Sequence, residues 1–199
     1  MGRGGGRGLA RRPPRRAPRI KITLFCEGEV TEPDYLGRLA AEVGLKLLWG
    51  RKGGKPAELV EAAIDARRAA KAEGFAGPHE IWVVFDCDEH PQVADARRRA
   101  EANGVRVAYS EPCFEVWPLL HHPDGVGPMT SPEAVERVCE RFPSYRRVKI
   151  LGYEALRPHL DDAVARAGRL RRANEATGVT NPYTDVDILV ELIRANGRP

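Results

Sequence analysis

Residues 85–90 of the chain are Phe85-Asp86-Cys87-Asp88-Glu89-His90, and they directly follow the apolar run Ile81-Trp82-Val83-Val84. A short run of large apolar and β-branched residues is typical of a buried strand. Residues two apart in an extended segment point the same way, so Asp86 and Asp88 should face one point at the strand's carboxyl end. Two carboxylates held that close repel each other, and either one takes up a proton or a cation binds between them. Since hard oxygen ligands favour Mg²⁺ or Mn²⁺, the stretch predicts a divalent-metal site on an open α/β sheet.

Strands and helices are expected to alternate on both sides of this segment. Apolar runs predict strands at 20–26, 45–49, 81–84 and 105–110, and amphipathic stretches predict helices at 32–43, 56–73 and 91–103. This alternation favours an α/β fold in which a mostly parallel sheet is flanked by helices. Sites in such sheets form beyond the carboxyl ends of the strands, where Glu27, Asp86 and Ser110 all fall.

An acidic turn follows the first strand, with the sequence Glu27-Gly28-Glu29-Val30-Thr31-Glu32-Pro33. Gly28 permits a tight turn and a close approach of the backbone. Thr31 is a good N-cap and Pro33 suits the first turn of a helix. Glu27 is therefore expected between a strand and a helix, at the same edge of the sheet as the aspartates.

Residues 111–122 form an aromatic-rich segment after the last of these strands, and a short helix is expected there despite Pro118. Glu115 lies between Phe114 and Trp117 in a stretch whose other residues look buried. A buried acid needs a partner, which the sequence leaves open as either a metal ion or a cationic side chain.

The rest of the chain predicts a mainly helical extension. Helices are expected at 132–141, capped by Ser131, at 153–177, and at 185–195, capped by Thr184. We therefore expect one folded domain at 20–199, made of an α/β catalytic core at 20–122 and the extension at 123–199.

The composition favours a folded domain over a membrane-spanning, secreted or zinc-stabilised protein. The chain has 199 residues, of which 42% are hydrophobic, and this is ample for a real core. No apolar run is long enough to cross a bilayer, and no signal-peptide pattern opens the sequence. The four cysteines are far apart and form no C-x-x-C pair, so structural zinc is not predicted. Reduced thiols in a cytoplasmic protein are the simplest interpretation.

The basic character of the chain belongs to its first 19 residues. They contain seven arginines and no acid, so the remainder carries a charge of −3 out of the total of +4. Their Arg, Gly and Pro composition predicts a disordered tail. Either a phosphate-binding arm or a solubilising extension fits this composition.

Four segments of the sequence together resemble the RloB-like family. They are residues 25–35 (FCEGEVTEPDY), 84–90 (VFDCDEH), 110–121 (SEPCFEVWPLLH) and 181–186 (NPYTDV). Their order and spacing match over nearly the whole chain after the tail. The acidic turn, the aspartate pair and the S-x-P-x-F-E-x-W segment are together specific for this resemblance.

The resemblance implies a Toprim-type fold, as in topoisomerases, primases and nucleases related to the OLD family, and Mg²⁺-dependent phosphodiester chemistry. The Toprim glutamate would correspond to Glu27 and its aspartate pair to Asp86 and Asp88. A second acid of OLD-type nucleases would correspond to Glu32, although the spacing from Glu27 is one residue longer here. RloB-like genes are associated with restriction-modification and phage-defence loci, which implies a role in defence by analogy.

OLD-type nucleases also use a serine, a glutamate and a lysine further along the chain. Ser110 and Glu115 are the candidates for the first two, and Lys149 is the best candidate lysine, although no motif fixes it. His90 follows the aspartates closely enough to orient a phosphate or a water molecule.

These residues predict a nuclease that hydrolyses a DNA or RNA phosphodiester with Mg²⁺ or Mn²⁺. The metal ligands would be drawn from Glu27, Glu32, Asp86, Asp88 and Glu115. The metal would acidify a water molecule and stabilise charge on the phosphate. Glu27 would share the metal or act as general acid/base, and Lys149 would neutralise charge in the transition state or donate a proton.

Each candidate also has a structural interpretation that the sequence leaves open. The alternatives are helix capping by Asp86 and Asp88, a solvated turn position for Glu27, an arginine partner for Glu115, a surface position for Lys149, and a loop position for His90. The D-x-D of haloacid dehalogenase-type phosphatases is disfavoured, because Glu89 and His90 replace the expected Gly and Thr. No G-x-x-x-x-G-K-[ST] loop is present, so a P-loop is not predicted.

A second class of function also fits the sequence. The protein could be a nucleic-acid-binding or regulatory subunit whose metal site is degenerate and which recruits a partner enzyme. Nucleic acid is the expected partner in either case, a homo-oligomer or an ATPase-type defence partner is possible, and no membrane is expected.

Overall fold

A five-stranded sheet forms the centre of the protein in the computed structural model, which describes residues 20–74, 77–87 and 92–198. The strand order is β2-β1-β3-β4-β5. The bounds are β1 Lys21–Cys26, β2 Leu48–Lys52, β3 His79–Asp86, β4 Arg106–Glu111 and β5 Tyr183–Thr184. The first four strands are parallel, and β5 pairs antiparallel with the end of β4. The predicted α/β class with a mostly parallel sheet flanked by helices is therefore confirmed.

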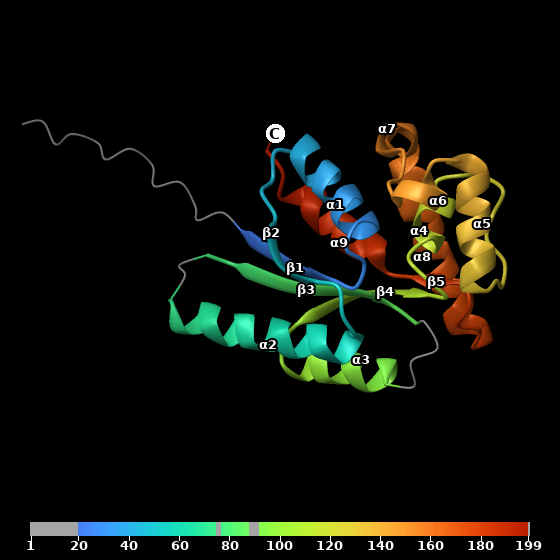
Figure 1. Ribbon diagram of the computed structural model, residues 1–199. Helices are drawn as coiled ribbons and strands as arrows, with labels where there is room; N and C mark the ends of the chain where they lie inside the picture. The colour runs from blue at the N-terminus through green and yellow to red at the C-terminus, as the bar shows by residue number, and fades with distance from the viewer. Residues whose placement is uncertain (1–19, 75–76, 88–91, 199) are drawn as a thin grey trace, which may run out of the picture.

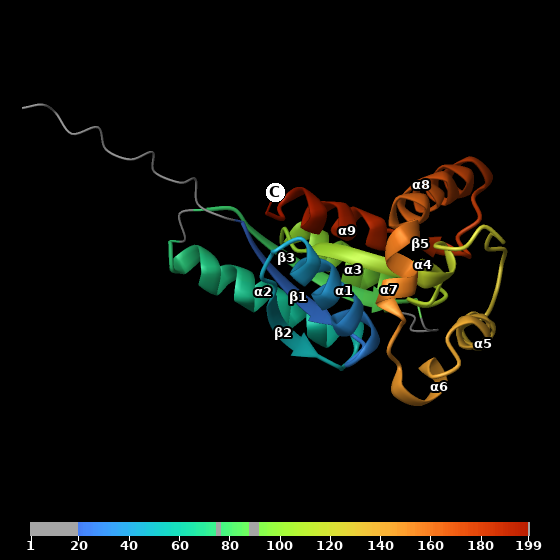
Figure 2. The ribbon, with the colours of Figure 1, turned by 90° about the horizontal axis from the view of Figure 1, so that it is seen from above.

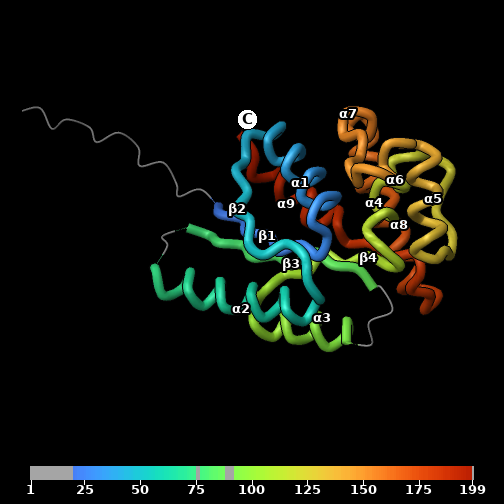
Figure 3. The backbone as a smooth tube through the Cα atoms, in the orientation of Figure 1, coloured from blue at the N-terminus to red at the C-terminus, as the bar shows by residue number. Residues whose placement is uncertain are grey.

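Helices cover both faces of this sheet (Figure 1). Two of them, α1 (Thr31–Glu42) and α9 (Val186–Ala195), lie on one face, and α2 (Pro56–Ala72) and α3 (Val93–Ala102) lie on the other. Figure 2 shows α1 and α9 on their shared face from above, where the two helices contact each other. Figure 3 shows the chain ending beside α1, where the Arg198 N–H donates to the carbonyl of Val43.

The central strand β3 is buried on both faces, as the apolar run predicts. Ile81, Val83 and Phe85 belong to the core under α2 and α3, whereas Trp82 and Val84 belong to the core under α1 and α9. This alternation follows from the two-residue period of a strand. The strand extends further than predicted, so that Asp86 is its last residue. Asp88 and His90 lie outside the described residues, as does the tail at 1–19.

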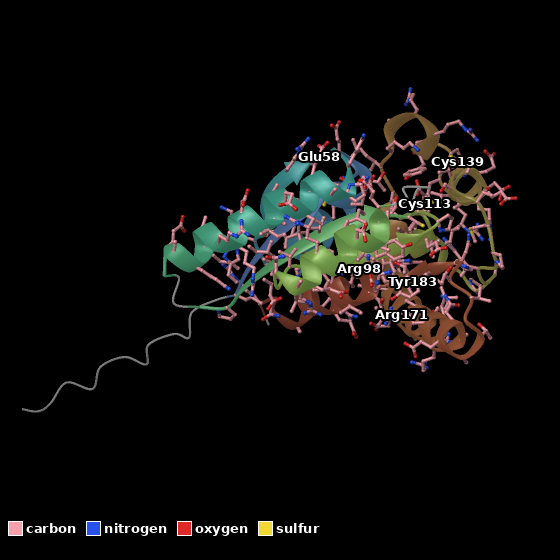
Figure 4. The ribbon with its side chains drawn as sticks, turned by 90° about the horizontal axis from the view of Figure 1, so that it is seen from below. Glu58, Arg98, Cys113, Cys139, Arg171 and Tyr183 are labelled. Atoms are coloured by element: carbon pink, nitrogen blue, oxygen red, sulfur yellow. The ribbon has the colours of Figure 1, made fainter. Side chains whose placement is uncertain are left out.

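Short helices gather beyond the carboxyl ends of the parallel strands (Figure 1). They are α4 (Val116–Leu119), α5 (Ser131–Arg141), α6 (Tyr145–Val148), α7 (Tyr153–Leu156), the 3₁₀ helix η1 (Arg157–His159) and the longer α8 (Leu160–Thr177). The final part of the extension returns to the sheet as β5 and α9. Arg171 of α8 ties these parts together, because its guanidinium donates to the Thr184 carbonyl and to both carboxylate oxygens of Asp187. Figure 4 shows Arg171 close to Tyr183 of β5.

Several predicted boundaries were wrong for local physical reasons. The strand expected at 45–49 lies at Leu48–Lys52, because Leu45 and Leu47 pack against the core while residues 48–52 pair with β1. The helix expected at 153–177 is interrupted by η1 around Pro158, since proline has no N–H for an α-helical bond. Thr184, expected as the cap of the last helix, pairs with Ser110 of β4 as part of β5.

Two predicted caps also differ. Ser131 is the first residue of α5, and Thr130 forms the capping box with Glu133 instead. Thr31 is the first residue of α1 and not its N-cap. Its hydroxyl donates to the carbonyl of Lys149, which is a long-range contact.

All four cysteines are free thiols. Figure 4 labels two of them, Cys113 and Cys139, in the region of the short helices. In the described part of the chain, no helix combines the length and the apolar character that crossing a membrane requires.

Gly50 in β2 provides a direct test of this packing. A Cβ at Gly50 would lie 2.7 Å from Cδ1 of the Phe25 ring, which is buried under α2. We expect Gly50→Ala to lower the free energy of unfolding by about 1–3 kcal/mol through overpacking, measured by urea denaturation. Gly127→Ala is the control, because a Cβ there meets nothing within 4 Å. Equal stability of the two variants would contradict the packing of β2 described above.

Candidate functional site

A cavity of about 280 Å³ opens beyond the carboxyl ends of β1 and β3. Five acids contribute to its wall, three from residues 27–32, one from the end of β3 and one from the segment before α4. The lining residues are Glu27, Gly28, Glu29, Val30, Thr31, Glu32, Asp86, Phe114, Glu115, Tyr145 and Lys149. Glu27, Glu32, Asp86, Glu115 and Lys149 were all predicted as site residues, so the fold brings five of the candidates to one place.

Glu27 points toward the end of β3. Its own N–H donates to the carbonyl of Val84 at 2.9 Å, which continues the pairing of β1 with β3. Its carboxylate accepts a hydrogen bond from the Asp86 N–H at 3.1 Å. The glutamate of the first turn and the aspartate of the central strand are therefore neighbours, as the sequence predicts.

Glu32 is buried against the turn that precedes its helix. Its carboxylate accepts a hydrogen bond from the Gly28 N–H at 2.9 Å, and only 4% of the residue is exposed. A Cβ on residue 28 would lie 2.5 Å from the carboxyl carbon of Glu32. The glycine is needed here because its lack of a side chain leaves room for the carboxylate.

Burial of several acids around one cavity shifts their proton affinities. Burial raises the pKa of Glu32 to about 7, and repulsion by Glu115 and Glu27 adds to this effect. Burial is also the main reason that the pKa of Asp86 lies well above its usual value, followed by repulsion from Glu32 and Glu115. Part of Asp86 nevertheless stays accessible. The cavity therefore disfavours the fully ionised set of acids, which is the condition that a bound cation relieves.

Glu115 has a tyrosine as its partner. The Tyr145 hydroxyl donates to the Glu115 carboxylate at 2.6 Å and lies 3.1 Å from the Thr31 hydroxyl, which donates to the Lys149 carbonyl at 2.9 Å. The sequence suggested a metal ion or an arginine as the partner of Glu115, and it did not suggest this tyrosine. The Tyr145 hydroxyl proton is used by the bond to ionised Glu115, and the Thr31 hydroxyl proton is used by the bond to the Lys149 carbonyl. No proton is then left for the contact between the two hydroxyl oxygens.

Lys149 lies at the rim of the cavity. It is exposed, and its ammonium group lies 5.0 Å from the centroid of the Tyr145 ring. Its backbone has a φ of 55°, a left-handed conformation that ends α6. The hydrogen bond from the Thr31 hydroxyl to the Lys149 carbonyl holds this turn against α1. Lys149, which no sequence motif identified, is therefore positioned by a tertiary contact.

The remaining candidates do not line the cavity as described. Ser110 pairs with Asp86 in the sheet register, but its side chain is buried and its hydroxyl contacts the Thr184 hydroxyl at 3.1 Å. Ser110 therefore connects β4 to β5 and does not reach the cavity. Asp88 and His90 lie outside the described residues.

Tyr145 and Thr31 are residues of this site that the sequence did not single out. Tyr145 lies in the basic segment 144–149 and is separated from Glu115 by 30 residues. Its complete burial is the only distinguishing feature, and it arises from packing of the extension against α1. No local pattern could have identified it.

The cavity fits Mg²⁺ or Mn²⁺ in the chemistry of its donors, because its acids offer hard carboxylate oxygens. Within residues 20–74, 77–87 and 92–198, no three His, Cys, Asp or Glu side chains are grouped closely enough to hold a metal ion. Two of the carboxylates, those of Glu27 and Glu32, are instead bound to backbone N–H groups.

The raised pKa of Glu32 predicts a pH-dependent stability. An acid whose pKa rises from 4.5 to about 7 on folding binds more protons when folded, so stability falls as the pH rises through that range. We expect the free energy of unfolding in EDTA to decrease by on the order of 2–3 kcal/mol from this group alone. Urea denaturation across this range should show a flatter profile for Glu32→Gln than for the wild type, and Glu101→Gln, an exposed acid on α3 outside the cavity, serves as the control. A Glu32→Gln profile as steep as the wild type would contradict this assignment.

The bond between Tyr145 and Glu115 predicts a stability loss in Tyr145→Phe. Removing the hydroxyl leaves a buried carboxylate oxygen without its donor, which costs about 1–3 kcal/mol. Tyr183→Phe is the matched control, because its hydroxyl makes a longer contact, 3.5 Å, with Asp185. A double-mutant cycle with Glu115→Gln should give a coupling energy above about 0.5 kcal/mol. Additive effects would show that the two side chains do not interact.

Comparison with known proteins identifies the family of the chain. Neither the curated proteins nor the solved structures gave a match to the chain. The model of one protein family, described as RloB-like protein, matches residues 22–193 and so spans the sheet, the acidic cavity and the helices beyond it. The chain therefore belongs to the RloB-like family.

Proposed function

We propose that this protein is a metal-dependent phosphodiesterase that hydrolyses DNA or RNA with Mg²⁺ or Mn²⁺. The observation that supports it best is the meeting of four acids, Glu27, Glu32, Asp86 and Glu115, in one cavity at the carboxyl edge of the sheet. Buried carboxylates are costly unless they are protonated or paired with a cation. A protein that needed them only for stability would gain nothing from placing all four together.

The four acids are the residues that would hold the metal. When bound, the metal would supply positive charge to the phosphate and would acidify a water molecule. Asp86 is the central ligand in this proposal, because Glu27 already touches its backbone and Glu32 and Glu115 both raise its pKa. Asp88 remains a proposed ligand from the sequence.

The other polar residues of the cavity have supporting roles in this proposal. Tyr145 orients Glu115 through its 2.6 Å hydrogen bond. Lys149 is exposed at the rim, where its ammonium can neutralise charge on a phosphate in the transition state. Glu27 acts either as a ligand or as a general acid/base, since its carboxylate lies between the two strand ends.

A role in phage defence, in which nucleic acid is the partner, is part of this proposal. Its support is membership of the RloB-like family, together with the basic composition of residues 1–19. An ATPase-type partner or a second copy of the chain would be the corresponding protein partner.

One observation favours the rival function of a nucleic-acid-binding subunit with a degenerate site. In the described part of the chain no three acidic side chains are grouped as ligands. The two functions differ in metal binding, because the phosphodiesterase needs Mg²⁺ or Mn²⁺ to bind with the four acids, whereas the subunit does not.

We therefore expect Mn²⁺ to bind the purified full chain, and cleavage of some nucleic acid to depend on it. Asp86→Asn and Glu27→Gln should each lower the cleavage rate by about 100-fold or more, since each removes a charged oxygen ligand. The measurements are isothermal titration with Mn²⁺ and a gel assay with single-stranded and duplex DNA and RNA.

The control is Glu101→Gln, an exposed acid on α3 outside the cavity. Cleavage that survives both Asp86→Asn and Glu27→Gln would exclude the proposed site. Absence of Mn²⁺ binding, with intact nucleic-acid binding, would instead support the degenerate subunit.

A further inference from the structure

A second hollow lies beside the acidic cavity, along the edge of the sheet. It has a volume of about 510 Å³ and lies between α1 and β2. We call it the β2 groove, and its lining residues are Glu29, Val30, Pro33, Asp34, Gly37, Arg38, Ala41, Trp49 and Lys52. Glu29 and Val30 line both hollows, so the β2 groove continues directly into the cavity that holds the four acids.

An exposed tryptophan forms part of the groove wall. Trp49 is 37% exposed, whereas Trp82 and Trp117, the other two tryptophans, are 1% and 0% exposed. The Trp49 ring stands over α1, where a Cβ at Gly37 would lie 3.6 Å from it. An aromatic ring of this size is normally more deeply buried. Its exposure on an edge strand therefore indicates a binding surface.

The strand that carries Trp49 is basic. Residues 46–55 contain Lys46, Arg51, Lys52 and Lys55 and no acid, and all four cations are exposed. Lys52 reaches over the Trp49 ring, with its ammonium group 4.7 Å from the centroid. Lys52 lines the groove, whereas Arg51 is ion-paired with Glu58 of α2, so the groove wall offers an aromatic surface with the Lys52 ammonium group next to it.

We propose that the β2 groove binds single-stranded nucleic acid, with a base stacked on Trp49 and phosphates on Lys52 and its basic neighbours. This proposal rests on the proposed function, and it specifies the form of the substrate. Aromatic rings beside cations bind single strands, because unstacked bases expose their faces and the backbone supplies the negative charge. A strand lying in the groove would pass over Val30 into the acidic cavity.

A second copy of the chain is the other occupant that an edge strand can attract. The residues of β2 oppose this pairing, since exposed cations on a short edge strand hinder the addition of another strand. Arg51 and Lys52 stand at the end of β2 nearest the acidic cavity. The cations of β2 are thus complementary to a phosphate backbone and would repel the β2 strand of a second copy.

Tryptophan fluorescence tests the proposal, because Trp49 is the accessible emitter. The full chain carrying Asp86→Asn, in EDTA, is titrated with short oligothymidylate or oligouridylate, so that neither cleavage nor metal contributes. We expect saturable quenching that is lost in Trp49→Phe, which retains most of the affinity in an anisotropy assay with a labelled oligonucleotide. Trp49→Ala should bind about tenfold more weakly or worse.

Leu48→Ala is the matched control, because Leu48 is equally exposed on the same strand, at 37%, and points to the other side of it. Its affinity should equal that of the parent chain.

Unchanged affinity in Trp49→Ala, equal quenching by a duplex of the same length, or a dimer in sedimentation that Trp49→Ala dissolves would each overturn the proposal. Binding that persists while wild-type cleavage is absent would count against the proposed function alone, and cleavage without Trp49 quenching would count against the groove alone.

Discussion

Repulsion among carboxylates in one partly closed cavity is the constraint on which the site depends. Glu32 and Asp86 both have raised pKa values, first because of burial and then because of the acids around them. Backbone N–H donors hold two of the acids in place, since the Gly28 N–H donates to Glu32 and the Asp86 N–H donates to Glu27. The fold thus accepts an unfavourable electrostatic arrangement, which is typical of functional sites.

The C-terminal extension contributes Tyr145 and Lys149 to this cavity. Tyr145 supplies the donor to Glu115, and the turn at Lys149 is fixed by the hydroxyl of Thr31 on α1. The extension also adds β5 and α9 to the α/β core. Core and extension therefore share one hydrophobic cluster, and both contribute residues to the cavity.

The acidic cavity and the β2 groove adjoin each other through Glu29 and Val30, and the exposed cations Arg51 and Lys52 stand at the end of β2 beside them. In the proposed function, the negative cavity attracts a cation, and the groove attracts the polyanion. Such a division lets a protein of slightly acidic core charge approach nucleic acid, because the positive groups are gathered where the strand would lie.

The sequence by itself determined the α/β class and the order of the main strands and helices. It also identified Glu27, Asp86 and Glu115 as candidate site residues. These features follow from local information, namely the two-residue and 3.6-residue apolar periods and the tendency of sites to lie at strand ends. Only the tertiary structure decided the partner of Glu115 and the position of Lys149. It also decided that the Ser110 hydroxyl contacts Thr184 and does not line the cavity. It also decided the position of β2 and the pairing of β5 with β4. These depend on contacts between residues tens of positions apart, whose packing and hydrogen bonds leave no periodic trace in the chain.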